Sequence, residues 1–153
     1  SNISDKDNEY NKYISIIKNN CDFTIPTKYK KADFKLVKSF KTDDKTINIY
    51  TNNKKEIIFK SGVKKEIYND GYQIIYFANG DMKQIFPEGK SVYYFQNEKT
   101  VQTTLRDGLQ IYKLNNGKIE IHNTDGNKLV MNIDGSWHRI DKDGNIVDLR
   151  DLK

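Results

Sequence analysis

Side chains that could perform acid–base or metal chemistry are few in this sequence of 153 residues. The two histidines are His122 and His138, and no Cys, His or carboxylate accompanies them at the spacing of a zinc-binding motif. Five aspartates come directly before a glycine, where a tight turn of the chain requires them. The sequence therefore predicts no catalytic site, no metal site and no cofactor, and we expect a protein that is not an enzyme.

Aromatic side chains offer a second kind of chemistry, because their ring faces bind apolar, cationic or proline-rich segments. The chain has 10 Tyr and 7 Phe, and Phe77, Tyr93 and Tyr94 stand in short apolar stretches. Packed against a neighbouring strand, such a ring pair stabilises a sheet by roughly 0.2–1 kcal/mol. Left exposed, the same rings commonly mark a surface for a partner. The residues alone leave both interpretations open.

The composition favours a thin folded structure without a large interior. Hydrophobic residues make up 36% of the chain and charged residues 31%, which is a poor basis for a thick core. The many aromatic and β-branched residues nevertheless favour a folded sheet over disorder. Cys21 is the only cysteine, so no internal disulfide forms, and no apolar run is long enough to span a bilayer. We therefore expect a protein of the cytoplasm that is not bound to a membrane.

A nine-residue repeat organises most of the sequence. Every glycine lies on it, in two runs with nine-residue spacing: Gly62, Gly71, Gly80 and Gly89, then Gly108, Gly117, Gly126, Gly135 and Gly144. The interval from Gly89 to Gly108 is two repeats plus one residue, and near Asn97 the expected turn has no glycine. Counting back by nine from Gly62 gives Asn53 and Asp44, residue types that tolerate left-handed backbone. We expect the repeat to begin near residue 42.

Each repeat predicts one short strand and one turn. Most of the glycines follow Asp or Asn, which is a strong hairpin signal, and six extended residues plus a three-residue turn make nine. The predicted fold is all-β: a single elongated antiparallel β-meander of about 11–13 short strands, largely solvent-exposed on both faces. Calcium-binding parallel β-rolls also have a nine-residue glycine–aspartate period. The bulky side chains between these glycines argue against that alternative.

The N-terminal segment departs from the repeat. Tyr10, Tyr13, Ile14 and Ile17 have helical spacing and predict a short helix. The residues after it predict an extended connector that protects an edge of the sheet, leading to a strand within residues 34–40. We therefore divide the chain into an N-terminal helix and arm, residues 1–40, and a single-sheet domain, residues 41–153.

The parity of the residue number labels the two faces of the predicted sheet. Three-residue turns place residues of equal parity opposite each other, so odd and even residues mark opposite faces within a regular run. Before the irregular interval both parities carry large apolar residues, and after it the odd residues are the more apolar. The sequence leaves open whether the extra residue near Asn97 exchanges the parity of the faces.

A more specific pattern occupies residues 77–126. It consists of Phe-Ala-Asn-Gly-Asp-Met-Lys-Gln-Ile-Phe-Pro-Glu-Gly from Phe77, Val-Tyr-Tyr-Phe from Val92, Gln-Thr-Thr from Gln102, Asp-Gly-Leu from Asp107 and Gly-Lys-Ile-Glu from Gly117. In its order and its irregular interval, this stretch resembles the C-terminal T-complex-protein (TCP, or G-box) domain of the CPAP/SAS-type centriole assembly scaffolds. The resemblance covers about residues 45–150. It implies a solvent-exposed single sheet in a protein of the cytoskeleton and the centrosome.

Members of that family bind a proline-rich segment of STIL or its relatives, which links the scaffold to the forming cartwheel. The family's binding aromatics fall on Phe77 and Tyr93, a further family Phe falls on Leu114, and its acidic residue falls on Glu120, where it suits an arginine of the partner. With two neighbouring tyrosines, the residues predicted to bind the partner are Phe77, Tyr93, Tyr94, Tyr112, Leu114 and Glu120.

The same residues pose a geometric condition. Phe77 and Tyr93 are odd, whereas Leu114 and Glu120 are even. A single site on one face therefore requires that the faces exchange parity near Asn97. Without the resemblance, Glu120 is interpreted equally well as the cross-strand charge partner of a nearby lysine.

The net charge of +5 keeps a second function open. A basic β-sheet module could bind nucleic acid or another polyanion and stack bases on the same tyrosines. The lysines are scattered singly or in pairs, however, so we expect nucleic acid to be the weaker alternative. Exposed terminal strands also predict weak self-association through the sheet ends.

Overall fold

The structure is a computed structural model that describes residues 3–30 and 33–151. Its helical elements are α1 (Ile3–Lys18), α2 (Thr27–Lys30) and the 3-10 turn η1 (Thr51–Asn53). Its strands are β1 (Leu36–Lys41), β2 (Lys45–Tyr50), β3 (Lys55–Phe59), β4 (Lys64–Ile67), β5 (Gln73–Tyr76), β6 (Met82–Ile85), β7 (Ser91–Phe95), β8 (Thr100–Thr104), β9 (Gln110–Lys113), β10 (Ile119–His122), β11 (Lys128–Met131), β12 (Ser136–Ile140) and β13 (Ile146–Asp151).

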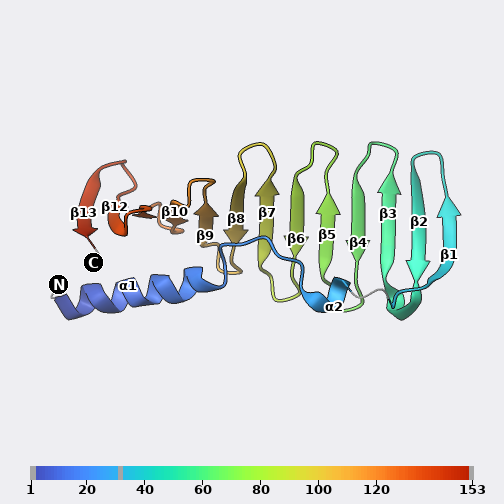
Figure 1. The fold of residues 1–153 in the computed structure, drawn as a ribbon, viewed down its shortest axis with the longest axis horizontal. Coiled ribbons are helices and arrows are strands. Elements are labelled where there is room, and N and C mark those ends of the chain that lie inside the picture. Colours follow the sequence, from blue (N-terminus) through green and yellow to red (C-terminus); the bar gives the residue numbers. More distant parts are fainter. Residues whose placement is uncertain (1–2, 31–32, 152–153) are drawn as a thin grey trace.

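The strands form one open sheet in which each strand pairs with its neighbours in the sequence, from β1 to β13. All of these pairings are antiparallel, and Figure 1 shows the strands side by side in chain order. The prediction of a single elongated β-meander of about 11–13 strands is thus confirmed, with 13 strands observed. The sheet begins at Leu36, within the segment that we assigned to the arm. The division into residues 1–40 and 41–153 stays a prediction.

The regular turns follow the chemistry that their glycines predict. In the turn between β5 and β6, the amide of Phe77 donates to the carbonyl of Asp81 (2.9 Å), and the amide of Gly80 donates to the carbonyl of Phe77 (3.1 Å). Gly80 has φ +94°, a left-handed conformation that side chains with a Cβ rarely adopt. Counted backwards, the repeat reaches Asn53, which has φ +58°, but Asp44 is not left-handed. The first turn is shorter, and the amide of Thr42 there donates to the carbonyl of Lys45.

The irregular turn joins β7 to β8 and exchanges the parity of the faces. Phe95 pairs with Thr100, so four residues form the loop instead of three, and Lys99 takes the left-handed position with φ +51°. Tyr94 lies opposite Val101, an even residue opposite an odd one. The face of the odd residues before this turn therefore continues as the face of the even residues after it.

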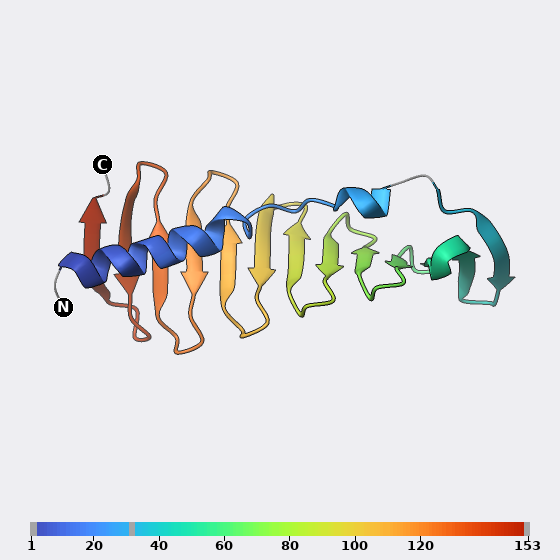
Figure 2. The same cartoon turned by 90° about the horizontal axis from the view of Figure 1, so that it is seen from below.

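Helix α1 packs on one face of the sheet's C-terminal half, as Figure 2 shows. Tyr13 of the helix and Cys21 form a buried cluster with Ile111, Ile121, Leu129 and Trp137 of strands β9–β12. The ring of Tyr10 stacks on Trp137, with 6.2 Å between centroids. The apolar odd residues of this half are therefore the inner side of a small core.

The arm after α1 runs along the same face toward the N-terminal half of the sheet (Figure 2). The buried side chain of Gln84 donates through Nε2 to the carbonyl of Thr24 and lies 2.8 Å from the hydroxyl of Tyr72. Farther along, Tyr29 stacks on Tyr72 at 3.9 Å between centroids. These contacts hold the arm on the sheet.

The prediction that both faces are largely exposed is therefore wrong for the face under α1 and the arm, and the arm covers a face where we expected it to protect an edge. The physical reason is that a single-layer sheet with two apolar faces gains free energy by burying one of them, and the N-terminal segment supplies the cover. We call the side that α1 and the arm contact the covered face and the other side the uncovered face. In the part of the chain that the structure describes, no helix combines the length and apolar character needed to cross a membrane.

Candidate functional site

Four residues of the uncovered face form a row across neighbouring strands. Tyr93 lies opposite Gln102, Gln102 opposite Tyr112, and Tyr112 opposite Glu120. Directly opposed residues point to the same face of a sheet and lie about 5 Å apart. The four-residue loop between β7 and β8 thus places an odd tyrosine and an even glutamate on one side, which is the condition for a single site.

An aromatic cluster lies at the β7 end of this row. The ring of Tyr93 lies 5.7 Å from that of Phe77 and 4.4 Å from that of Phe95, measured between centroids. All three rings are partly exposed. Phe95 was not among our predicted residues, although its position two residues after Tyr93 on the same strand was a usable signal. Leu114 opens the turn between β9 and β10, and its even parity places it on this face.

Tyr94 does not join the other predicted residues. Successive side chains of a strand point to opposite faces, so Tyr94 lies on the covered face, where its ring is 6.1 Å from that of Phe23 of the arm. Two adjacent tyrosines in the sequence do not by themselves indicate which one belongs to the site. Inclusion of Tyr94 in the same surface as Tyr93 was therefore a wrong prediction.

Glu120 is held by a neighbour on its own strand. Its Oε1 lies 3.1 Å from Nε2 of His122, and the ring of His122 packs against that of Tyr112 at 4.6 Å between centroids. The residue that pairs with Glu120 is therefore His122, and not a nearby lysine as in the alternative interpretation. Glu120 remains partly exposed, with 27% of its side chain accessible. Its second carboxylate oxygen can therefore accept a hydrogen bond from a ligand.

The hydroxyl of Tyr93 is oriented by Asp81. It donates to Oδ2 of Asp81 at 2.6 Å, while the backbone amide of Gln96 donates to Oδ1 at 2.9 Å. The hydrogen bond to the Asp81 carboxylate is the main reason that the pKa of Tyr93 rises to about 12. The same bond stabilises the ionised carboxylate and lowers the pKa of Asp81 below its ordinary value. Asp81 thus holds the hydroxyl edge of the Tyr93 ring in place at the β7 end of the row.

Replacing Asp81→Asn is expected to lower the pKa of Tyr93 from about 12 toward its ordinary value. Because the pKa of Asp81 is lowered in the folded protein, its bond to Tyr93 persists above the ordinary pKa of a carboxyl group and is lost as the pH falls through the depressed value. An NMR titration of tyrosine rings labelled with ¹³C measures both effects. Asp107→Asn, in a turn where Asp107 accepts from the amide of Leu109, is the control and leaves Tyr93 unchanged.

The site is an open surface and not an enclosed cavity. A hollow of about 220 Å³ is lined by Lys28, Tyr29 and Phe34 with neighbouring turn residues, and Tyr29 belongs to the buried cluster of the covered face. Within residues 3–30 and 33–151, no three His, Cys, Asp or Glu side chains group closely enough to hold a metal ion. The row from Tyr93 to Glu120 is therefore suited to an extended chain laid across the strands.

Similarity of this chain to known proteins is found among solved structures. No protein-family model matches the chain, and no curated protein matches it. The TCP10 domain of Danio rerio CPAP, solved in complex with a peptide of Danio rerio STIL, is 27% identical with a TM-score of 0.63. That alignment covers 67% of this chain and 57% of the other.

The TCP domain of Drosophila melanogaster SAS-4, solved in complex with a proline-rich motif of Ana2, is 28% identical with a TM-score of 0.61. Here 63% of this chain and 64% of the other are covered. This chain thus spans less than two thirds of either solved domain. A CPAP G-box domain, 20% identical over 74% of this chain and 90% of its own length, has a TM-score of 0.52 and supports the fold alone.

The matching architecture is specific. An open meander of 13 strands without a second sheet is an unusual arrangement, because sheets of this size commonly curl, split or are covered on both faces. The two solved domains match about two thirds of this chain in fold, and more than a quarter of the aligned residues are identical. In fold and in sequence, this chain is thus similar to the TCP10, or G-box, domains of CPAP and SAS-4.

Proposed function

We propose that this domain is a protein-interaction module that binds a proline-rich segment of a STIL-type partner on its uncovered face. Phe77 and Tyr93 supply aromatic surface, Tyr112 continues it, and Glu120 accepts a hydrogen bond from an arginine of the partner. The proposal is supported by the two similar solved domains, which are in complex with a STIL peptide and with a proline-rich motif of Ana2.

One observation carries this function. The loop between β7 and β8 brings Tyr93 and Glu120 onto the same face, three strands apart in one row. Three strand spacings of about 4.8 Å give about 14 Å, which a polyproline helix spans with about five residues at about 3.1 Å each. A short proline-rich segment is therefore long enough to contact the aromatic cluster and Glu120 together. Its backbone is already ordered, which reduces the entropy lost on binding.

We further propose that the protein is a scaffold without enzymatic activity in the cytoplasm, at the centriole or centrosome, and the similarity to CPAP and SAS-4 domains supports this proposal. Weak association of copies is a further prediction. The chain presents exposed apolar side chains near both ends of the sheet, Leu36 and Val37 at one end and Ile146 and Val147 at the other. Unpaired strand edges and such side chains favour end-to-end contact.

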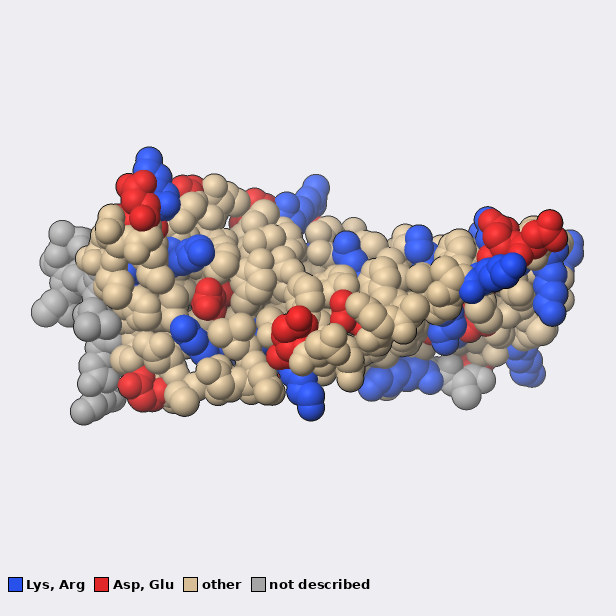
Figure 3. Space-filling view, turned by 90° about the horizontal axis from the view of Figure 1, so that it is seen from above, with Lys and Arg blue, Asp and Glu red and all other residues tan. Residues whose placement is uncertain are grey.

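Binding of nucleic acid or another polyanion receives less support. Figure 3 views the molecule from the side opposite to Figure 2 and shows basic and acidic side chains interspersed along its length. A polyanion site needs a continuous basic strip. Glu120, at the end of the row that begins at Tyr93, also repels phosphate groups.

Calorimetric titration with a proline-rich peptide of a STIL-type partner tests the proposal. Replacement of Glu120→Gln keeps the shape of the side chain and removes its charge, so we expect affinity to fall about tenfold while the thermal melt holds. Glu88→Gln, in the exposed turn between β6 and β7, is the matched control and binds like the wild type. A folded wild-type protein that does not bind the peptide contradicts the proposed function.

A further inference from the structure

The uncovered face continues beyond the candidate site toward the N-terminal half of the sheet. Tyr93 lies opposite Lys83, Lys83 opposite Ile75, and Ile75 opposite Lys65. Lys65 in turn lies opposite Ile57. The row that contains Tyr93 and Glu120 therefore extends across β6, β5, β4 and β3 as alternating lysine and isoleucine.

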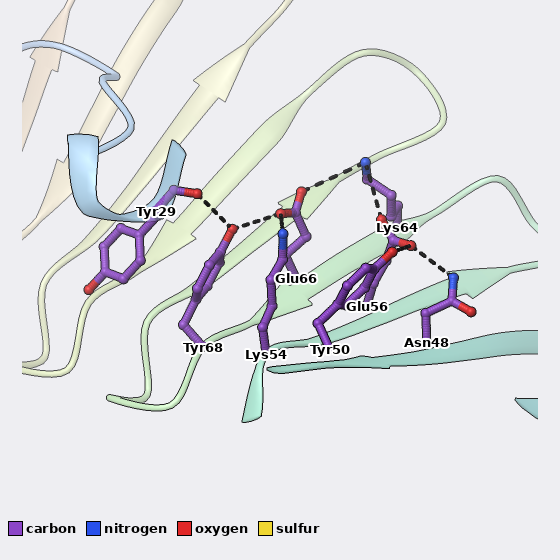
Figure 4. Close-up of polar contacts among 8 residues, drawn as sticks. All are labelled: Tyr29, Asn48, Tyr50, Lys54, Glu56, Lys64, Glu66 and Tyr68. Atoms are coloured by element: carbon purple, nitrogen blue, oxygen red, sulfur yellow. Dashed lines mark hydrogen bonds and ion pairs between the residues drawn. The ribbon is translucent and has the colours of Figure 1, made fainter. Parts of the chain in front are cut away.

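Charge is segregated between the two faces of these strands. The only carboxylates of β3–β6 are Glu56 and Glu66, which lie opposite each other on the other face. Figure 4 shows them paired there with lysines: Lys54 lies 3.4 Å from Glu66, and Lys64 lies 3.7 Å from Glu66 and 3.8 Å from Glu56. The hydroxyls of Tyr50 and Tyr68 complete this network. The negative charge of Glu56 and Glu66 is therefore compensated by lysines on the face opposite to the row.

The lysines of the row have no such partners. Among the described residues, neither Lys65 nor Lys83 forms an ion pair, and both are partly exposed. The isoleucines beside them stay partly exposed as well, except Ile75, of which 8% is accessible. We call this stretch the lysine–isoleucine surface; it consists of Ile57, Lys65, Ile67, Ile75, Lys83 and Ile85.

We propose that the lysine–isoleucine surface binds an acidic and apolar segment of the same partner, continuous with the proline-rich segment. This inference rests on the proposed function. Two observations support this occupant. The surface adjoins Tyr93 without interruption. Its unpaired positive charge complements carboxylates, and its isoleucines complement aliphatic side chains. A partner bound along the row thus meets Glu120 at one end and the lysines at the other.

The strand spacing sets the pattern of charge along the partner. Glu120 on β10 and Lys83 on β6 are four strand spacings apart, about 19 Å, and Lys65 on β4 is six spacings away, about 29 Å. An extended proline-rich chain advances about 3.1 Å per residue. The partner therefore carries a basic residue at one end, prolines after it, and carboxylates about six and about nine residues from the basic one.

Three fluorescein-labelled synthetic peptides test this pattern by anisotropy. The core peptide has one arginine and the proline-rich segment; the acidic peptide adds aspartates and leucines at the predicted spacing; the neutral peptide has asparagines in place of those aspartates. The wild type is expected to bind the acidic peptide about fivefold to tenfold more tightly than the neutral one, from two partly exposed charge pairs.

The variant Lys65→Gln/Lys83→Gln is expected to lose this preference and keep its affinity for the core peptide. Lys128→Gln, on the same face beyond Glu120, is the matched control and retains the preference. Thermal melts check that each variant is folded. Equal affinity of the wild type for the acidic and neutral peptides overturns the inference while binding of the core peptide leaves the proposed function intact.

Two other outcomes of these binding experiments lead to different conclusions. Failure of the core peptide to bind contradicts the proposed function, and this inference falls with it. A duplex DNA probe that binds with steep salt dependence, and that the double variant no longer binds, overturns the peptide occupant and assigns the surface to a polyanion. The expected result is that the DNA binds no more tightly to the wild type than to the double variant.

Discussion

Replacing Tyr93→Ala is expected to weaken binding of the proline-rich peptide by about 2 kcal/mol or more, which is about thirtyfold in Kd. Tyr93 sits at the centre of the aromatic cluster, between Phe77 and Phe95. Its removal takes away the ring on which we propose that a proline packs and leaves a depression between the remaining two rings. Isothermal titration calorimetry of wild type and variant with the same peptide measures the loss.

Tyr94→Ala is the matched control for this prediction. It removes the same side chain one residue later, but from the covered face, where Tyr94 packs near Phe23 of the arm. We expect a modest loss of stability and an unchanged peptide affinity. Tyr93→Phe, which loses only the bond to Asp81, is expected to retain most of the affinity. Equal effects of Tyr93→Ala and Tyr94→Ala would contradict the assignment of the site to the uncovered face.

Replacing Trp137→Ala is expected to lower the free energy of unfolding by about 3–5 kcal/mol. Trp137 is 2% exposed and is the largest fully buried side chain. It packs with Ile121 and Leu129 in the cluster beneath α1, and Tyr10 stacks on it. Truncation leaves a cavity at the centre of the contact between helix and sheet. Urea denaturation followed by circular dichroism measures the loss.

The effect of Trp137→Ala is expected to be local to one half of the molecule. Each strand of a meander contacts only its neighbours, so distant strands keep their own stability. Hydrogen exchange is expected to accelerate in α1 and β11–β12 while β4–β6 keep their protection. Ile133→Ala, at a turn position that is 73% exposed, is the control and changes stability by less than about 0.5 kcal/mol. Unchanged exchange in α1 would show that the helix docks independently of Trp137.

Local turn chemistry made the fold predictable. A glycine after Asp or Asn, as in the turn at Gly80, specifies a left-handed residue, and the spacing of nine then fixes strand length and antiparallel order. These are short-range properties that each repeat carries by itself. The resemblance of residues 77–126 to TCP domains likewise depends on the order of residues and needs no coordinates.

The site was predictable in part. Phe77, Tyr93, Tyr112, Leu114 and Glu120 lie on one face, and their positions came from the resemblance and from parity. Tyr94 was wrongly included, since adjacency in sequence means opposite faces in a strand. Phe95 was overlooked although it shares the parity of Tyr93. Whether these residues bind a partner stays a prediction.

The approximate number and the direction of the strands follow from the sequence alone, because hairpin turns and strand alternation are local. Which face is covered is set by the tertiary structure. That choice depends on contacts between distant parts of the chain, such as the bond from Gln84 to the carbonyl of Thr24, 60 residues away. It also depends on the four-residue loop ending at Lys99, where one extra residue exchanges the parity of both faces. Side-chain packing across the sheet, which no local pattern encodes, thus separates the buried tyrosines from those that stay partly exposed.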